Sequence, residues 1–121
     1  MSTQAYIEDG YTEVGFMKEV SGVHQACRFS FRPVLATSVR STLDRWSEIA
    51  PELKSSRINN LIKDHVTEWD LTHNGNILPI TIETLERLKQ PFVDRMFNII
   101  TYSDSSDASD SARQREEDAK N

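Results

Sequence analysis

The stretch "EWDLTHNGNILPIT", residues 68–81, lies between two segments with helical periodicity and combines a tryptophan, an Asn-Gly pair and a proline. Asn74 and Gly75 tolerate positive φ, so they favour a tight turn at which the chain doubles back. Thr81 is a good N-cap for the helix that follows. Trp69 is expected to end the preceding helix, with its ring buried and its indole N–H hydrogen-bonded. Each of these residues has a structural role, and none requires a catalytic one.

Two segments nearer the N-terminus predict an antiparallel β-hairpin. In "HQACRFSFRP", residues 24–33, apolar and polar side chains alternate, which is typical of a half-buried strand. The residues expected to face inward are Cys27, Phe29 and Phe31. Residues 12–19 predict the partner strand, with Val14 and Phe16 on one face, and a Ser-Gly pair at 21–22 predicts the turn. Because a two-stranded hairpin is only marginally stable alone, helices are expected to cover its apolar face.

Four segments carry apolar residues at helical spacing. They are residues 37–50, 55–69, 82–88 and 91–102. Pro51 is expected to end the first of these helices or to open a short linking turn, and Pro91 to occupy the first turn of the last one. The predicted fold class is α+β, with an N-terminal β-hairpin or small antiparallel sheet packed on about four helices.

Length and composition predict one folded domain with polar ends. Residues 1–10 are polar and expected to be loose, and residues 11–102 are expected to form a single α+β domain. Residues 103–121 contain six acidic and three basic residues and no large apolar side chain. Such a segment buries too little surface to offset its ordering entropy, so it predicts a disordered acidic C-terminal tail.

Charge and cysteine content narrow the function classes. The chain has a net charge of −5 and no stripe of clustered Lys and Arg, so it lacks the features of a nucleic-acid-binding protein. Cys27 is the single cysteine, which suits a reducing compartment. No signal-peptide pattern is present, and no apolar run approaches the roughly twenty residues that cross a bilayer. We therefore expect a soluble cytoplasmic protein that binds neither nucleic acid nor membrane.

Few residues have the features of a chemical site. The sequence contains no GxGxxG, GxxxxGK[ST], GxSxG or HExxH motif. His24 and Cys27 resemble half of a zinc site, but the strand alternation places them on opposite faces and no second pair exists. Asp70 and His73 lack a placed nucleophile. We therefore expect no enzyme activity and no catalytic, cofactor-binding or metal-binding residues, with Cys27 as a core residue.

A helix–turn–helix over residues 38–69 is an alternative that would make the chain a DNA-binding regulator. The polar groups that its second helix offers to a DNA groove are Ser56, Arg57, Asn59, Asn60 and Lys63. The net acidity of the chain and the position of Pro51 in the linker argue against it.

Two short motifs resemble a known family. "RFSFRPVLATSV" resembles the "F-x-Y-R-P-L" strand-to-helix junction of the tail assembly chaperones of long-tailed phages and prophages. "VTEWDLTHNGNILPITIETLERL" resembles their "W-D-x-x-x-x-G-x-x-x-P-x-T-x-E-x-L-x-x-L" segment, so the resemblance spans about residues 28–88. The matching positions, which define the fold in the family, are Phe31, Arg32, Pro33, Trp69, Asp70, Gly75, Pro79, Thr81 and Glu83. The chain departs from the pattern in having phenylalanine where tyrosine is frequent, a second tryptophan at Trp46, and a long acidic tail.

The resemblance implies a non-enzymatic chaperone in the cytoplasm of a bacterial host. Such proteins bind the tape-measure protein and, through a frameshifted extension, recruit tail-tube subunits. A groove between helices would suit a long helical client. The last helix is apolar on nearly all sides, so the candidate partner-binding residues are Phe92, Val93, Phe97 and Tyr102. Two alternatives for this helix stay open: it lies at the centre of the core, or it buries one side in a homo-oligomer. The chain as a whole could instead be a generic protein-interaction module or a component of a head–tail or tail-terminator assembly.

Overall fold

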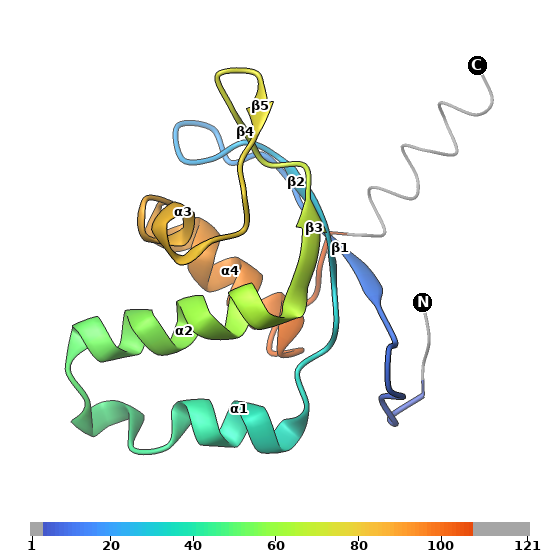
Figure 1. Cartoon of the computed structure of the whole chain (residues 1–121), viewed down its shortest axis with the longest axis vertical. Coiled ribbons are helices and arrows are strands. Elements are labelled where there is room, and N and C mark those ends of the chain that lie inside the picture. The colour runs from blue at the N-terminus through green and yellow to red at the C-terminus, as the bar shows by residue number, and fades with distance from the viewer. Residues whose placement is uncertain (1–3, 108–121) are drawn as a thin grey trace.

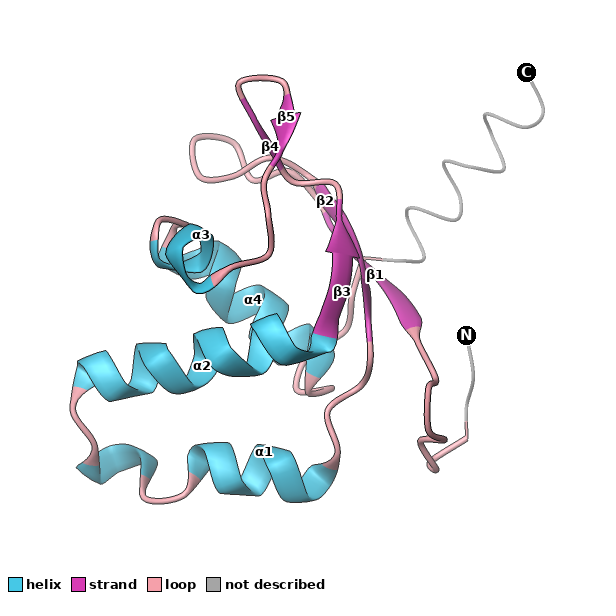
Figure 2. Cartoon of the chain, in the orientation of Figure 1, coloured by secondary structure: helices cyan, strands magenta, loops and turns pink. Residues whose placement is uncertain are grey.

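A three-stranded antiparallel sheet stands on one side of the molecule, and the α-helices lie on the other (Figure 1, Figure 2). This computed structural model describes residues 4–107. The strands of the sheet, in spatial order, are β1 (Glu13–Met17), β2 (Cys27–Phe31) and β3 (Val66–Trp69). The helices are α1 (Ala36–Leu43), α2 (Pro51–His65), α3 (Ile82–Glu86) and α4 (Gln90–Ile100), with a 3-10 turn η1 (Trp46–Glu48) after α1. Two short strands, β4 (Thr72–His73) and β5 (Asn76–Ile77), form a separate hairpin. The predicted α+β class, with a small antiparallel sheet on four helices in the described part of the chain, is confirmed.

The β1–β2 hairpin forms as predicted, and its register determines which face of β1 is buried. The inward residues of β2 are, as expected, Cys27, Phe29 and Phe31. Gly15 of β1 lies opposite Phe29. A Cβ on Gly15 would lie 2.5 Å from Cζ of Phe29, so the phenyl ring fills the space that a side chain would need. Val14 and Phe16 do share a face, but it is the outer one, and Met17 takes the buried position in the strand.

The helix predicted over residues 55–69 is wrong at both ends. Pro51 neither ends a helix nor opens a linking turn, because it occupies the first turn of α2. The N–H groups of a first turn have no partner within the helix, so a proline there costs no hydrogen bond. After α2 the chain continues as β3, which pairs with β2 through a bulge. Because of this bulge, Val66 and Trp69 are both buried although they are three residues apart. A bulged strand therefore reproduces the spacing of a helix, and Trp69 lies on a strand.

The helix predicted over residues 37–50 is broken in the middle. α1 stops early, Arg45 has a left-handed backbone with φ of 53°, and η1 follows. Arg57 of α2 donates hydrogen bonds to the carbonyl oxygens of Thr42 (3.0 Å) and Asp44 (2.9 Å). Carbonyls at the end of a helix have no partner within it, so the guanidinium stabilises the break. No residue of α1 is buried, which makes it an outer helix attached to α2.

Apart from Trp69, which lies on β3 and does not end a helix, the stretch over residues 68–81 folds as its local chemistry predicts. Asn74 and Gly75 adopt φ of 52° and 80°, and β4 pairs with β5 on either side of them. Thr81 caps α3, because its hydroxyl accepts a backbone N–H of the first helical turn at 3.2 Å. The indole N–H of Trp69 donates to a carbonyl nine residues later at 2.7 Å. The predicted turn, cap and indole hydrogen bond are confirmed.

The predicted disordered tail is wrong for its first five residues. Residues 103–107 run back to β1, where the backbone N–H of Asp107 donates to the carbonyl of Phe16 at 2.7 Å. Residues 103–107 are held in this position by electrostatic attraction, because Arg95 of α4 forms ion pairs with Asp104 and Asp107. The parts of the terminal predictions that lie outside the described residues concern residues 1–3 and 108–121.

Candidate partner-binding groove

A groove of about 740 Å³ opens between α2, α3 and the first half of α4. Its apolar residues come from these three helices, from η1 and from the turn before α4. They are Trp46, Pro51, Ile58, Leu85, Leu88 and Val93. Leu85 and Val93 belong to the buried core, whereas Trp46 is half-buried at the surface. The apolar lining therefore runs from the core to the surface of the molecule.

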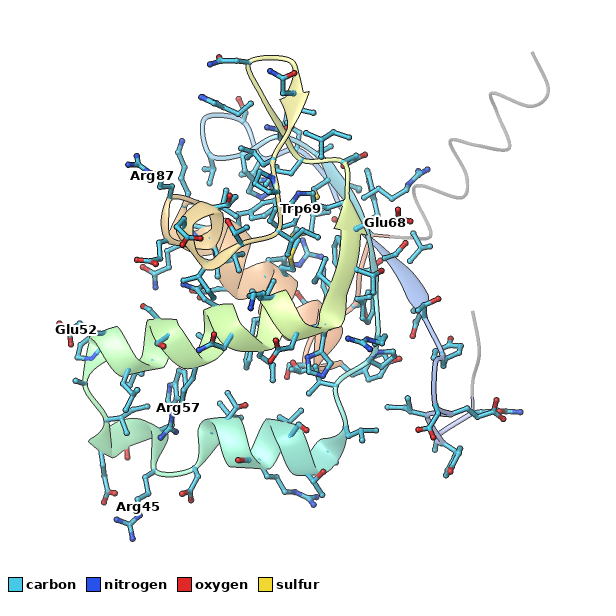
Figure 3. All side chains as sticks on the ribbon, in the orientation of Figure 1. Arg45, Glu52, Arg57, Glu68, Trp69 and Arg87 are labelled. Carbon is cyan, nitrogen blue, oxygen red and sulfur yellow. The ribbon has the colours of Figure 1, made fainter. Side chains whose placement is uncertain are left out.

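The charged residues of the groove are mostly acidic. They are Glu52, Glu86, Asp94 and one base, Lys54. The ammonium group of Lys54 lies 5.7 Å from the centre of the Trp46 ring, a distance at which a cation and an aromatic face attract each other. Glu52 projects outward at the N-terminal end of α2 (Figure 3). Three carboxylates against one ammonium give the groove a net negative charge.

Asn59 of α2 is the one buried polar residue among residues 4–107, with 6% of its surface exposed. It lines the groove, and no hydrogen bond joins its side chain to another residue of the described chain. The amide is not among the described side-chain groups that are both buried and without a partner, so its polar atoms still meet water in the groove, where a ligand can bond to them. The sequence alone suggests only a DNA-reading role for Asn59. The signal that points to it is an asparagine on the apolar stripe that Ile58 and Ile62 form along α2.

The four residues predicted to bind a partner do not form one surface. Phe92, Val93 and Phe97 are only 2%, 9% and 8% exposed, because α4 packs against both α2 and β1. Of the four residues, only Val93 borders the groove. Tyr102 is 53% exposed, but it follows the far end of α4, where its hydroxyl donates to the carboxylate of Glu13. α4 is thus central in the core. The sequence does not predict the groove, because its lining comes from several elements and not from one helical stripe.

The residues of the family resemblance lie outside the groove lining. The buried ones are Phe31, Pro33 and Trp69, Thr81 is half-buried, and the exposed ones are Arg32, Asp70, Gly75, Pro79 and Glu83. Arg32 donates to the carbonyl of Asp64 at 2.7 Å, which connects the segment after β2 to the end of α2. The carboxylate of Asp70 accepts the backbone N–H of Arg28 at 2.8 Å and so connects β2 to the end of β3. These positions stabilise the fold that presents the groove.

The residues considered as candidates for a chemical site, Cys27 and His24, have structural roles. Cys27 is buried, and this burial, together with the nearby Asp70 carboxylate, raises the pKa of its thiol to about 12, so the nucleophilic thiolate is scarce at neutral pH. The ring of His24 packs edge-on against Phe92 at 5.1 Å between ring centres. Within residues 4–107, no group of three or more His, Cys, Asp or Glu side chains could hold a metal ion. None of the described helices has the length and apolar character of a membrane span.

Two of the five groups that a helix–turn–helix would offer to DNA are not exposed on the outer face of α2. Arg57 holds the end of α1, and Asn59 is buried in the groove wall. The remaining three are the exposed residues Ser56, Asn60 and Lys63.

In comparisons with known proteins, no family model matches the chain, and no curated protein or solved structure matches it.

Proposed function

We propose that this chain is a non-enzymatic tail assembly chaperone of a long-tailed phage or prophage, and that it holds a helical segment of the tape-measure protein in the groove. The observation that carries the proposal is the groove itself, in which apolar residues from several elements lie beside acidic residues and the amide of Asn59. The resemblance over residues 28–88 supports the identity of the client. Tail-tube subunits would bind elsewhere, through an extended form of the chain.

The shape and composition of the groove suit a helix. An amphipathic helix buries its apolar stripe when it lies in a groove between helices. The aliphatic lining accepts such a stripe, and Trp46 at the surface supplies an aromatic anchor. Aromatic residues of this kind contribute a large share of binding energy at interfaces. A tape-measure protein is long and helical, so it offers many apolar stripes before the tail assembles around it.

The polar groups of the groove define the client further. The carboxylates of Glu52, Glu86 and Asp94 favour a segment with flanking Lys or Arg residues. The amide of Asn59 favours a Ser, Thr, Asn or Gln side chain within the apolar stripe. The segment we expect is therefore a basic amphipathic helix with one polar residue on its apolar face.

Co-expression with the tape-measure protein of the same phage genome tests the proposal. We expect the wild-type chain to raise the soluble yield of that protein and to co-purify with it. Trp46→Ala should weaken the complex by about tenfold or more, because it removes an aromatic anchor without opening the core. Ile77→Ala is the matched control, since Ile77 is apolar, 66% exposed and located on β5 outside the groove.

Three results would count against the proposal. Equal capture by Trp46→Ala and Ile77→Ala chains would place the client on another surface. No capture by the wild-type chain would remove the chaperone function. Capture of a head–tail or tail-terminator protein through the groove, without any tape-measure complex, would favour a structural role in the particle.

A further inference from the structure

Residues 35–49, which include α1 and η1, are attached to the molecule less firmly than α2, α3 and α4. Each of those three helices has at least one buried residue. No residue of α1 or η1 is buried, and of residues 35–49 only Val39 packs against the core. The chain is fixed just before this segment, because Val34 is buried and its N–H donates to the carbonyl of Ile100 at 3.1 Å. It is fixed again just after it, where α2 begins and packs against α3 and α4.

Extended backbone lies at both ends of residues 35–49. Leu35 has φ of −66° and ψ of 147°, and Ile49 has φ of −94° and ψ of 154°, so neither is helical. The N-cap residues of α1 and α2, Leu35 and Ala50, make no side-chain cap hydrogen bond. A hinge consists of a few such residues at the ends of elements, where φ and ψ absorb the motion. Rotation about these two ends breaks neither a helix nor a side-chain cap.

Arg57 of α2 holds this segment by hydrogen bonds. Its side chain is half-buried and extends from α2 toward α1 (Figure 3). Nη1 of Arg57 donates to the carbonyl oxygens of Thr42 at 3.0 Å and Asp44 at 2.9 Å. Both carbonyls lie at the end of α1, just before the left-handed residue Arg45. One guanidinium therefore fixes the point at which α1 ends and η1 approaches.

The same segment contributes one part of the groove lining. Trp46 of η1 lines the groove, and the other lining residues come from α2, α3, α4 and the turn before α4. The lining from α3 and α4 includes Leu85 and Val93, which belong to the close-packed core and hold their positions with it. Trp46 has no such support, and its ring lies 5.7 Å from the ammonium group of Lys54. The groove thus has a fixed wall on α3 and α4 and a movable one on η1.

We infer that residues 35–49 form a hinged flap that gates the groove. Opening of the flap carries Trp46 out of the groove, and the hydrogen bonds of Arg57 keep the flap closed. The gating role rests on the proposed function, because the helical client enters and leaves through the open flap and is held by the closed one. Lids of this kind open and close in microseconds to milliseconds and set the rates of binding and release.

Nitrogen-15 relaxation dispersion of the full-length chain tests the motion without any client. Arg57→Gln removes the guanidinium, and Arg40→Gln on the exposed face of α1 is the matched control. We expect dispersion at the indole N–H of Trp46 and at backbone amides of the flap. The open population should be about fivefold larger in the Arg57 variant, the change expected from losing one hydrogen bond, and unchanged in the control. The indole N–H of Trp69, bonded in the core, should show no dispersion.

Stopped-flow binding of a basic amphipathic segment of the tape-measure protein tests the gating. The flap is closed in most molecules with and without the client, so Arg57→Gln should speed entry and release alike. We expect association and dissociation rate constants about fivefold larger than in the wild-type chain, and a Kd within about twofold of it. Arg57 is not part of the groove lining, so its loss removes no contact with the client. Arg40→Gln should leave both rate constants unchanged.

Each result supports or contradicts one part of the inference. A flap without dispersion in both the wild-type and Arg57→Gln chains would overturn the motion, and so would dispersion that extends to α4 and Trp69, because it would report unfolding of the whole domain. A higher Kd with an unchanged association rate would overturn the gating. Absence of binding in every chain would remove the proposed function and the gating role with it, whereas dispersion in the client-free chain would still establish the hinged flap.

Discussion

α1 and α4 both carry apolar residues at helical spacing, yet one lies outside the core and the other forms its centre. No residue of α1 is buried, whereas the buried residues of α4 are Phe92, Val93, Met96, Phe97, Ile99 and Ile100. α4 packs against both α2 and β1, while α1 is attached to α2. The difference teaches that a helix with a wide apolar surface need not be a binding surface. In this chain the binding surface is found where half-buried residues of several elements meet.

The largest expected effect is on the free energy of unfolding, which a truncation in α4 should lower much more than a truncation in α1. Phe92→Ala on α4 should lower the free energy of unfolding by about 3–5 kcal/mol, because the phenyl ring is 2% exposed and its removal leaves a cavity. Leu43→Ala on α1 should lower it by less than about 1 kcal/mol, because Leu43 is 41% exposed. Urea denaturation of both variants measures these changes. Equal effects would contradict the contrast between a central and an outer helix.

A second test concerns the packing of the sheet under α4. Gly15→Val should destabilise the fold by about 1–3 kcal/mol, because the added side chain overlaps the ring of Phe29. Val14→Ala, one residue away on the outer face, should change stability by less than about 1 kcal/mol. Thermal unfolding of the two variants makes the comparison. An unchanged melting temperature for Gly15→Val would show that the β1–β2 register differs from the one described.

A smaller effect is expected where α1 joins α2. Arg57→Ala removes the hydrogen bonds to Thr42 and Asp44 and should lower the free energy of unfolding by about 1 kcal/mol. Amides of α1 should exchange faster than in the wild-type chain, whereas those of α4 should keep their protection. Arg40→Ala, exposed on α1, is the control. Loss of protection in both helices would mean that α1 belongs to the core after all.

The smallest expected effect is the pH dependence of the ion pairs that hold residues 103–107 beside α4. Burial of Asp107 favours its neutral form, but the Lys18 N–H and the Arg95 guanidinium outweigh it and hold the pKa of Asp107 below its usual 3.8. A carboxyl group whose pKa is lower in the folded state than in the unfolded state stabilises the fold at a pH above its unfolded-state pKa. This stabilisation is lost as the pH falls through the folded-state pKa. We therefore expect a constant stability difference between wild type and Asp107→Asn from pH 7 to about pH 4. Below that pH the difference should shrink, as followed by urea denaturation. A difference that grows on acidification would contradict this sign.

Much of the fold can be predicted from local sequence chemistry. The alternation of Cys27, Phe29 and Phe31 identifies β2 and its buried face. The Asn-Gly turn and the cap at Thr81 are likewise local, so the stretch between β3 and α3 folds as predicted. The remaining features depend on contacts between distant residues. The bulge in β3 exists only against β2, and the break after α1 is stabilised by Arg57.

The groove and the placement of residues 103–107 against β1 could not be predicted from the sequence, for the same physical reason. The groove requires the relative placement of α2, α3, α4 and η1, which no single periodic stripe specifies. Charge composition predicts disorder for an acidic segment, but it does not show that Arg95 lies within reach of Asp104 and Asp107. The position of Asn59 on the apolar stripe of α2 can be seen in the sequence, but the groove beside it cannot.

The most direct test of client binding in the groove is a nitrogen-15 NMR titration of the chain with a basic amphipathic segment of the tape-measure protein. The side-chain amide of Asn59 and the indole N–H of Trp46 should shift as the segment binds, because both line the groove. The indole N–H of Trp69 should not shift, because it is already bonded to the carbonyl of Leu78 in the core. Shifts at Trp69 or in β4–β5, with Asn59 and Trp46 unchanged, would contradict binding in the groove.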